Sequence, residues 1–218
     1  MEQGLPEIET LIAFGAALLA MQLMPGPDTM LVIGRGIGQG RKTALGTVLG
    51  MTLLAGAVQI PLLVFGVAAL IGSSDIAFMI LRVAGACYLI WLGARLLWTS
   101  VGRRADLATS PQASPWTTMC EGAISALSNP APLLFMFAFL PQFVDPSRHP
   151  VWLQLLILGV LQKLSGFVIL GGVALASGAL GSWLARRPAV IAWQQRLAGT
   201  VMVLLGIRLL LGDSRPGR

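Results

Sequence analysis

The chain has 218 residues, of which 56% are hydrophobic and only 11% are charged, with a formal net charge of +6. Soluble domains carry roughly 25% charged residues, so this composition excludes an ordinary soluble domain and predicts a membrane protein. The basic residues lie in short loops and form no run with interleaved aromatic residues. We therefore expect a lipid bilayer, and no nucleic acid, as the surrounding partner.

Six apolar stretches are long enough to cross a bilayer, which requires roughly 20 residues of helix. In chain order they cover 8–24, 43–71, 76–98, 119–140, 151–184 and 189–211. Prolines interrupt the first stretch at Pro25-Gly26-Pro27 and the fourth at Asn129-Pro130-Ala131-Pro132. Acidic residues precede the first stretch, unlike the basic start of a signal peptide, so we expect it to be a mature helix.

Alternate glycines at 34, 36, 38 and 40 separate the first two stretches. They lack the Lys-Ser/Thr of a phosphate-binding loop and follow no strand. We expect a flexible cytoplasmic turn there and no nucleotide. Farther along, Gly46 and Gly50 form a GxxxG pair, which predicts a close contact between helices.

The polar segment 100–117 divides the chain into 1–99 and 118–218, each with three apolar stretches. Basic residues favour one set of alternate loops and helix ends, by nine to five. The nine are Arg35, Arg41, Lys42, Arg95, Arg103, Arg104, Arg186, Arg187 and Arg196. The five are Arg82, Arg148, Arg208, Arg215 and Arg218. The positive-inside rule places the nine in the cytoplasm. Both termini are then expected in the periplasm, with the protein in a bacterial inner membrane.

The two halves share motifs in the same order. The first is Pro25-Gly26-Pro27, matched by Pro130-Ala131-Pro132. The second is Arg82-Val83-Ala84-Gly85 followed by Leu92-Gly93-Ala94-Arg95, matched by Arg196-Leu197-Ala198-Gly199 followed by Leu205-Gly206-Ile207-Arg208. Three helices are an odd number, so the second copy inserts upside down. The sequence therefore predicts an all-α membrane fold of two inverted three-helix repeats, with the first and fourth helices broken, which is typical of secondary transporters.

The breaks supply most of the candidate substrate-binding residues. Unpaired backbone at membrane depth is tolerated only inside protein or beside a wet cavity, which makes Pro25, Gly26, Pro27, Asn129 and Pro130 candidates. Asn129 either satisfies backbone groups freed by Pro130 or contacts a polar ligand.

Two charged residues join these candidates. Asp28 follows the first break, and a carboxylate near membrane depth is usually functional. It either binds a substrate ammonium, carries a coupling proton, or caps the helix that restarts there. Lys163 lies midway along the fifth stretch and needs a partner, either Asp28 or a substrate carboxylate, unless it snorkels to the interface. Gln59 is expected in helix packing, and Glu121 and Arg82 at the membrane interface.

Several segments resemble the signatures of the LysE/RhtB amino-acid exporters. They are Pro25-Gly26-Pro27-Asp28-Thr29-Met30, Gly40-Arg41-Lys42 with Gly46 and Gly50, Gly85-Ala86-Cys87-Tyr88-Leu89, Asn129-Pro130, Phe139-Leu140-Pro141-Gln142-Phe143 and the segment 199–209. The resemblance covers nearly the whole chain. It implies efflux of amino acids such as homoserine, threonine, leucine or lysine, driven by the proton-motive force, with no enzymatic activity and no cofactor.

This chain departs from the family pattern directly after the Asn-Pro pair, where members usually have a lysine. Here that position is Ala131. Our hypothesis is that Lys163 supplies the missing charge to the same region.

Two other classes are weighed against an amino-acid exporter. A membrane thiol-disulfide carrier needs a reactive cysteine at equivalent sites of each half, and Cys87 and Cys120 are not equivalent. An exporter of a metal cation or another small solute fits Asp28, but one carboxylate and the single His149 are poor ligands for soft metals. No resident metal is expected. The identity of the solute stays open, and the sequence is compatible with a homodimer.

Overall fold

The computed structural model describes residues 8–23, 26–69, 75–98, 114–145, 150–185 and 188–211, and all of its secondary structure is helical. The elements are α1 (Ile8–Gln22), α2 (Pro27–Gly38), α3 (Arg41–Leu49), η1 (Gly50–Leu54), α4 (Ala55–Pro61), η2 (Leu62–Val67), α6 (Asp75–Trp98), α7 (Pro115–Ser128), α8 (Pro130–Leu134), η3 (Phe135–Phe139), η4 (Leu140–Phe143), α9 (Val151–Ala185) and α10 (Pro188–Leu211). The predicted all-α class is confirmed.

Among the described residues, two helices are long and apolar enough to cross a bilayer. They are the continuous run Arg41–Val67, which contains two π-helical stretches, and Val151–Ala179. The pair Pro115–Ser128 and Pro130–Phe143, bent by 60°, makes a third candidate. Large apolar side chains such as Phe65 and Val168 are exposed on these helices, as expected for a protein embedded in lipid. The other three of the six predicted spans remain predictions, and so does the inverted repeat.

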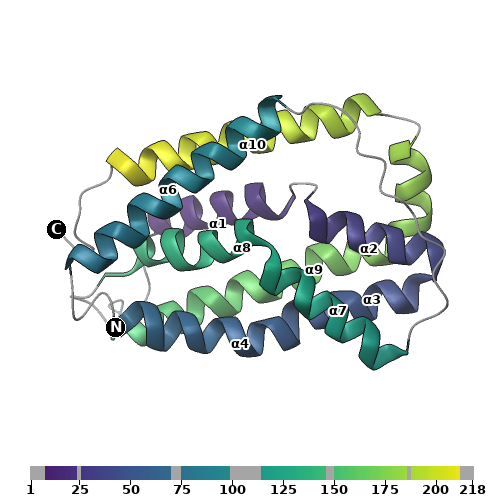
Figure 1. Cartoon of the computed structure of the whole chain (residues 1–218), viewed down its shortest axis with the longest axis horizontal. Helices are drawn as coiled ribbons and strands as arrows, with labels where there is room; N and C mark the ends of the chain where they lie inside the picture. Colours follow the sequence, from purple (N-terminus) through teal and green to yellow (C-terminus); the bar gives the residue numbers. More distant parts are fainter. Residues whose placement is uncertain are drawn as a thin grey trace.

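The helices run between two ends of the molecule (Figure 1). At one end lie the start of α1, the start of α6 and the end of α10. At the other lie the junction of α2 with α3, the start of α7 and the end of α9. Helices α6 and α10 pack side by side along one edge, α4 and α9 lie along the opposite edge, and α1 and α8 run between them.

The glycine-rich segment after the first break is helical rather than a flexible turn. Helix α2 continues through Gly38, and only Gly40 has a left-handed φ, of 89°. A side chain at Gly36 would place its Cβ 1.9 Å from Ser177 Oγ on α9. The prediction of a flexible turn was wrong for residues 34–38, which are helical, and Gly36 among them serves close packing against α9.

The predicted linker 100–117 falls largely outside the described residues. Its last three residues form the first turn of α7 instead. Ser114 caps that turn by accepting a hydrogen bond from the Thr117 amide at 3.2 Å. A serine N-cap followed by Pro115 is a strong start for a helix, which explains why α7 begins four residues before the predicted apolar stretch.

Small residues bring α7 against the helix that carries the GxxxG pair. A Cβ on Gly50 would lie 1.9 Å from the Met119 carbonyl oxygen, and a Cβ on Gly122 would lie 2.2 Å from the Thr47 carbonyl oxygen. Gly46 also packs against α7, at Thr118. The predicted close contact is therefore confirmed, and its partner is α7.

The two helices that carry the second repeated motif, α6 and α10, pack in opposite directions. A Cβ on Gly93 would meet the Gly199 carbonyl oxygen at 2.6 Å, and one on Gly206 would meet the Ala86 carbonyl oxygen at 2.9 Å. Arg82 is buried, and its Nε donates to the Leu209 carbonyl at 2.8 Å. The expected interfacial position of Arg82 was wrong, because the last turn of α10 leaves carbonyls without helical donors.

Candidate functional site

The first break separates α1 from α2. Helix α1 ends at Gln22, and α2 begins at Pro27 with Gly26 as its N-cap. Gly26 has extended backbone and offers no side chain to cap the helix. Pro27 occupies the first helical position, where a missing N–H costs nothing. Of the predicted site residues at this break, Pro25 lies outside the described residues.

The second break lies between α7 and α8. Asn129 has extended backbone (φ −83°, ψ 106°), as expected for a residue before proline. Its side-chain Oδ1 accepts a hydrogen bond from the Ala131 amide at 3.4 Å, and Pro130 occupies the first helical position. Asn129 is therefore the N-cap of α8, which bears out its expected role in satisfying freed backbone groups.

Asp28 joins the two breaks. Its Oδ1 accepts a hydrogen bond from Ser125 Oγ at 2.8 Å, and its Oδ2 accepts one from Asn129 Nδ2, also at 2.8 Å. Asp28 does not cap α2, so that alternative was wrong. It lies in the first turn of α2, where the helix dipole favours a negative charge. The carboxylate is thus held by the last turn of α7 and by the cap of α8.

Lys163 contributes the opposite charge from α9. Its Nζ donates to Gln59 Oε1, and Gln59 Nε2 donates in turn to the Ala126 carbonyl at 3.2 Å. Gln59 is only 1% exposed, so Lys163 points into the protein and does not snorkel. The Lys163 stem packs over Gly56, where an added Cβ would lie 3.6 Å from the lysine Cδ.

The two charged groups approach the same turn of α7. Asp28 binds the side chain of Ser125, and Lys163 reaches the backbone of Ala126 through Gln59. Asp28 and Lys163 each keep a separate hydrogen-bond partner, so the structure brings opposite charges together without a direct salt bridge between them.

The side chain of Ala131, unlike its backbone amide, lies apart from this network. It is buried in an apolar cluster with Ala86 and Leu89 on α6 and with Met202 and Leu209 on α10. A side chain at position 131 therefore faces α6 and α10, whereas Lys163 approaches from α9. Position 131, on α8, and Lys163, on α9, therefore do not occupy the same place in the structure.

Gln22, at the end of α1, is a polar residue that the sequence reasoning missed. Its Nε2 donates to the Gln162 carbonyl at 3.0 Å and to Ser165 Oγ at 2.8 Å. Its Oε1, like the Oε1 of Gln162, is buried without a hydrogen-bond partner. A side-chain amide three residues before a Pro-Gly-Pro break is a signal that was available in the sequence. Ser125 was missed too, and no local pattern marks it.

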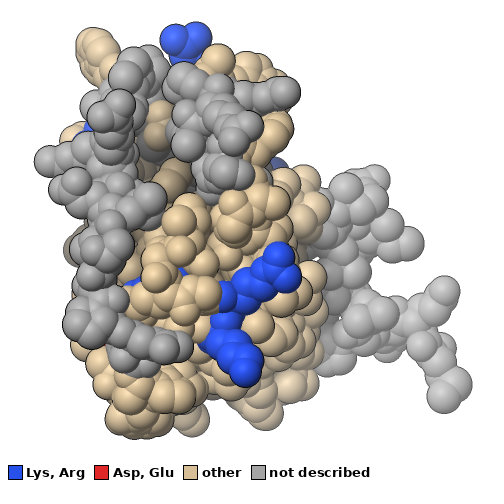
Figure 2. All heavy atoms as spheres, turned by 90° about the vertical axis from the view of Figure 1, so that its right-hand side faces the viewer, with Lys and Arg blue, Asp and Glu red and all other residues tan. Residues whose placement is uncertain are grey.

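The charged residues at one end of the molecule form a separate group. Arg35 on α2 makes an ion pair with Glu121 on α7. Arg41 and Lys42 are exposed at the start of α3. Figure 2 views this end and shows basic but no acidic side chains among the described residues. Glu121 is partly exposed, and it pairs with Arg35 across two helices.

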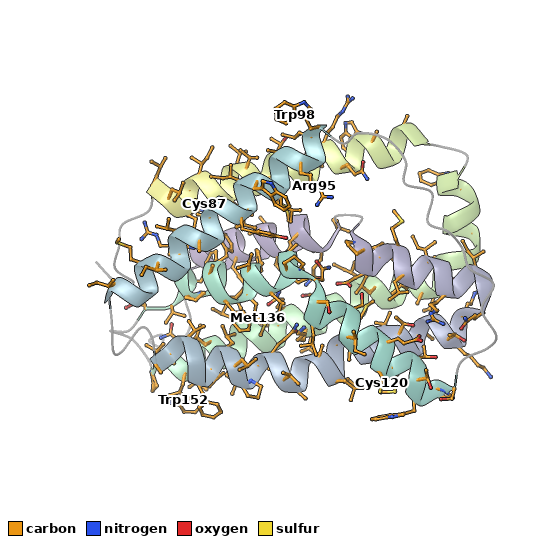
Figure 3. The ribbon with its side chains drawn as sticks, in the orientation of Figure 1. Cys87, Arg95, Trp98, Cys120, Met136 and Trp152 are labelled. Atoms are coloured by element: carbon orange, nitrogen blue, oxygen red, sulfur yellow. The ribbon has the colours of Figure 1, made fainter. Side chains whose placement is uncertain are left out.

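The two cysteines are free and lie on different helices, Cys87 on α6 and Cys120 on α7. Figure 3 shows them well separated. Within the described residues there is no group of three or more His, Cys, Asp or Glu side chains placed to hold a metal ion.

Comparison with known proteins identifies relatives over most of the chain. The sequence profile of the LysE type translocators matches residues 19–213. A leucine efflux protein from Enterobacter sp. (strain 638) is 32% identical over 188 residues, which cover 86% of this chain and 88% of that protein. A homoserine/homoserine lactone efflux protein from Salmonella typhimurium is 31% identical over 190 residues, covering 87% and 90%. An uncharacterized membrane protein from Vibrio cholerae is 28% identical over 203 residues, covering 93% and 97%. No solved structure matches.

Proposed function

This chain belongs to the LysE type translocator family, and from that membership we propose that it exports amino acids or close derivatives from the cytoplasm, driven by the proton-motive force. Relatives over nearly nine-tenths of its length are named as efflux proteins for leucine and for homoserine. Leucine and homoserine are amino acids, and the second relative is also named for homoserine lactone, a close derivative. Both names support the same class of solute here.

One observation carries the proposal: the Asp28 carboxylate and the Lys163 ammonium are both linked to the last turn of α7, beside the second break. An amino acid at neutral pH carries one ammonium and one carboxylate. The Asp28 carboxylate binds the ammonium, and Lys163 binds the carboxylate. Each Asp28 oxygen accepts one hydrogen bond, from Ser125 or Asn129, and has a second lone pair for the substrate.

The same contacts count against a metal cation as the solute. Donor groups, the Ser125 hydroxyl and the Asn129 amide nitrogen, point at the Asp28 oxygens. A hard cation requires several oxygen ligands instead. Nothing in the placement of Cys87 and Cys120 supports a thiol-disulfide carrier.

Six membrane crossings in two inverted repeats fit the arrangement of the helices. Helices α6 and α10 have 24 residues each, which corresponds to about 36 Å and spans a hydrocarbon core of about 30 Å. They pack antiparallel, and the equivalent glycines Gly93 and Gly206 each approach the backbone of the other helix. A two-fold relation between repeats produces such reciprocal contacts.

The proposed orientation puts the basic end in the cytoplasm of a bacterial inner membrane. Arg35 lies in the last turn of α2, and Arg41 and Lys42 begin α3; the junction of these helices lies at that end (Figure 1). Basic residues favour the cytoplasmic side. Trp98, at the end of α6, and Trp152, at the start of α9, are exposed. Tryptophan near helix ends suits the two membrane interfaces. The start of α1 and the end of α10 then face the periplasm.

Asp28 also serves as the proton-coupling group in this proposal. In this proposal the Asp28 carboxylate holds either a proton or the substrate ammonium, but not both. A proton that enters therefore releases the substrate that leaves. One charge moving through 100 mV supplies about 2.3 kcal/mol, which sustains roughly a fifty-fold gradient of solute.

The test is transport by purified full-length protein in proteoliposomes with an imposed proton gradient and a panel of labelled amino acids. We expect at least one amino acid to accumulate in wild-type vesicles, and Asp28→Asn to abolish gradient-driven accumulation. Asp145→Asn, near the end of η4 and outside the site, is the matched control and should transport normally. Absence of amino-acid transport together with movement of divalent cations would overturn the proposal.

A further inference from the structure

Gln59 lies in the interior of the protein, between the helices that hold the two charged groups. It belongs to α4, which packs against both α7 and α9, and its side chain is only 1% exposed. A buried side-chain amide is costly unless its polar atoms are hydrogen-bonded. An apolar side chain would fill the space between helices equally well, so the amide points to a role beyond the expected helix packing.

The second break supplies the acceptor that orients the Gln59 amide. In a continuous helix the Ala126 carbonyl would accept a hydrogen bond from the amide four residues later. That residue is Pro130, which has no N–H. Gln59 Nε2 donates to the Ala126 carbonyl instead, at 3.2 Å. A carbonyl only accepts hydrogen bonds, so the nitrogen of the Gln59 amide is fixed toward α7 and its oxygen is left for another donor.

That donor is Lys163, whose Nζ donates to Gln59 Oε1. Among the described residues no salt bridge joins Lys163 to Asp28. Gln59 links the ammonium to Ala126, and the neighbouring residue, Ser125, donates to the Asp28 carboxylate at 2.8 Å. Both charges are therefore anchored by neutral partners to adjacent residues of one helical turn, and Gln59 is the anchor of the positive charge.

The charge of the side chain at position 59 decides whether the Lys163 ammonium is available to a solute. A neutral amide oxygen accepts a weaker hydrogen bond from an ammonium than a carboxylate does. A carboxylate on the solute can therefore take the ammonium from Gln59, whereas a carboxylate built into the protein at position 59 would keep it. A solute without a carboxylate leaves the ammonium on Gln59 and gains no contact from it.

We propose that Gln59 is a positioning residue that makes a carboxylate on the solute a requirement for tight binding. This role rests on the proposed export function and deepens it. Gln59 presents the Lys163 ammonium to the solute, so the site takes amino acids and rejects the corresponding amines, which keep the side chain and the ammonium but lack the carboxylate. Gln59→Glu reverses the preference, because its carboxylate pairs with Lys163 and repels the carboxylate of an amino acid.

The test compares amino acids with the amines that lack only the carboxylate. L-leucine is paired with isoamylamine and L-homoserine with propanolamine, and the other amino acids of the transport panel are paired in the same way. Binding is measured by calorimetry on the purified full-length protein in detergent at neutral pH, because the uncharged form of an amine leaks across vesicles. We expect wild type to bind the amino acid about tenfold or more tighter than its amine, as one hydrogen bond to a charged group allows.

Two variants of Gln59 separate its charge from its packing. Gln59→Met removes both hydrogen bonds with little change in shape, and the ratio of the two affinities should fall to about one because Lys163 is no longer held for the solute. In Gln59→Glu the amine should bind about tenfold or more tighter than the amino acid. Gln39→Glu is the matched control. Gln39 Oε1 accepts from Arg35 Nη1 at 3.0 Å at the end of α2, so this variant also places a carboxylate beside a cation, and it should keep the wild-type ratio.

The ratio of the two affinities distinguishes positioning from a structural role. An equal loss of affinity for both solutes in the Gln59 variants, with the ratio unchanged, makes Gln59 structural only and overturns the positioning role while leaving export intact. Equal binding of amino acid and amine by wild type also overturns it. An unchanged ratio in Gln59→Met is sufficient to do so where Gln59→Glu does not fold. Failure of wild type to bind or move any amino acid of the panel overturns the export proposal itself.

Discussion

Asn129 donates its side-chain amide to the Asp28 carboxylate at 2.8 Å, across 101 residues of sequence. The same side chain caps α8 through its oxygen. Asn129 therefore ends α7, caps α8 and holds the half-buried Asp28 carboxylate beside the other break. This double role makes the stability and the transport contributions of Asn129 separable by mutation.

We expect Asn129→Ser and Asn129→Ala to lose export alike but to differ in stability. Serine still accepts a hydrogen bond as an N-cap, whereas alanine does not, and the difference is about 1 kcal/mol. Neither side chain reaches Asp28 with a donor amide. Thermal unfolding in detergent and counterflow in proteoliposomes measure the two effects. Normal export by Asn129→Ser would show that the bond to Asp28 has no part in transport.

Lys163→Met should abolish export while the protein remains folded. Methionine retains an unbranched stem over Gly56. Loss of the donor to the buried Gln59 Oε1 should cost about 1–3 kcal/mol of stability, which is less than the typical stability of a folded protein. Expression level and gel-filtration profile establish folding, and amino-acid counterflow measures function. Undiminished export by this variant would remove Lys163 from the site and with it the idea that this lysine compensates for Ala131.

Gly50→Ala should destabilise the protein by about 1–3 kcal/mol through overpacking. Its Cβ would lie 1.9 Å from the Met119 carbonyl oxygen, which is backbone and has no rotamer to yield. Gly178→Ala, on α9, is the matched control because nothing lies within 4 Å of its Cβ. Alanine there should be neutral or stabilising by about 0.5–1 kcal/mol. Equal melting temperatures of the two variants would contradict the close contact of η1 with α7.

Gly93→Ala and Gly206→Ala should each destabilise the contact between α6 and α10 by a similar amount. The two glycines occupy equivalent motif positions and approach the opposing backbone reciprocally. Because they share one interface, the double variant should lose less stability than the sum of the single losses. Unfolding of the two single variants and the double variant gives the coupling. A neutral effect at either glycine would argue against the two-fold relation.

Arg82→Met should lower stability by about 1–3 kcal/mol, because it leaves the Leu209 and Leu210 carbonyls at the end of α10 without the guanidinium donors. Arg82→Lys restores part of the loss, since one ammonium reaches one carbonyl. Arg208→Met on the exposed face of α10 is the control and should be near neutral. The comparison uses melting temperatures in one detergent. A loss as large in Arg208→Met would assign the effect to charge rather than to capping.

The sequence by itself determined the helices and their interruptions. Apolar length requires a helix in lipid, and proline removes a backbone donor wherever it stands. Both effects are local, so the stretches at 76–98, 151–184 and 189–211 agree with α6, α9 and α10 to within one residue at each end. The same reasoning located the breaks beside Asp28 and at Asn129. It also selected Lys163, whose charge stands out in an apolar stretch.

Only the tertiary structure decided which of these groups meet. From local sequence a glycine suggests flexibility, but Gly36 lies within α2. Glycine is needed there because Ser177 of α9 occupies the space of a Cβ. Arg82 reads as interfacial, but the end of α10 offers it buried carbonyl acceptors. The link from Asp28 to Ser125 and Asn129, and the path from Lys163 through Gln59 to Ala126, join residues 67 to 104 positions apart. Such pairings depend on how the helices pack, because no local pattern encodes the distance between side chains on different helices.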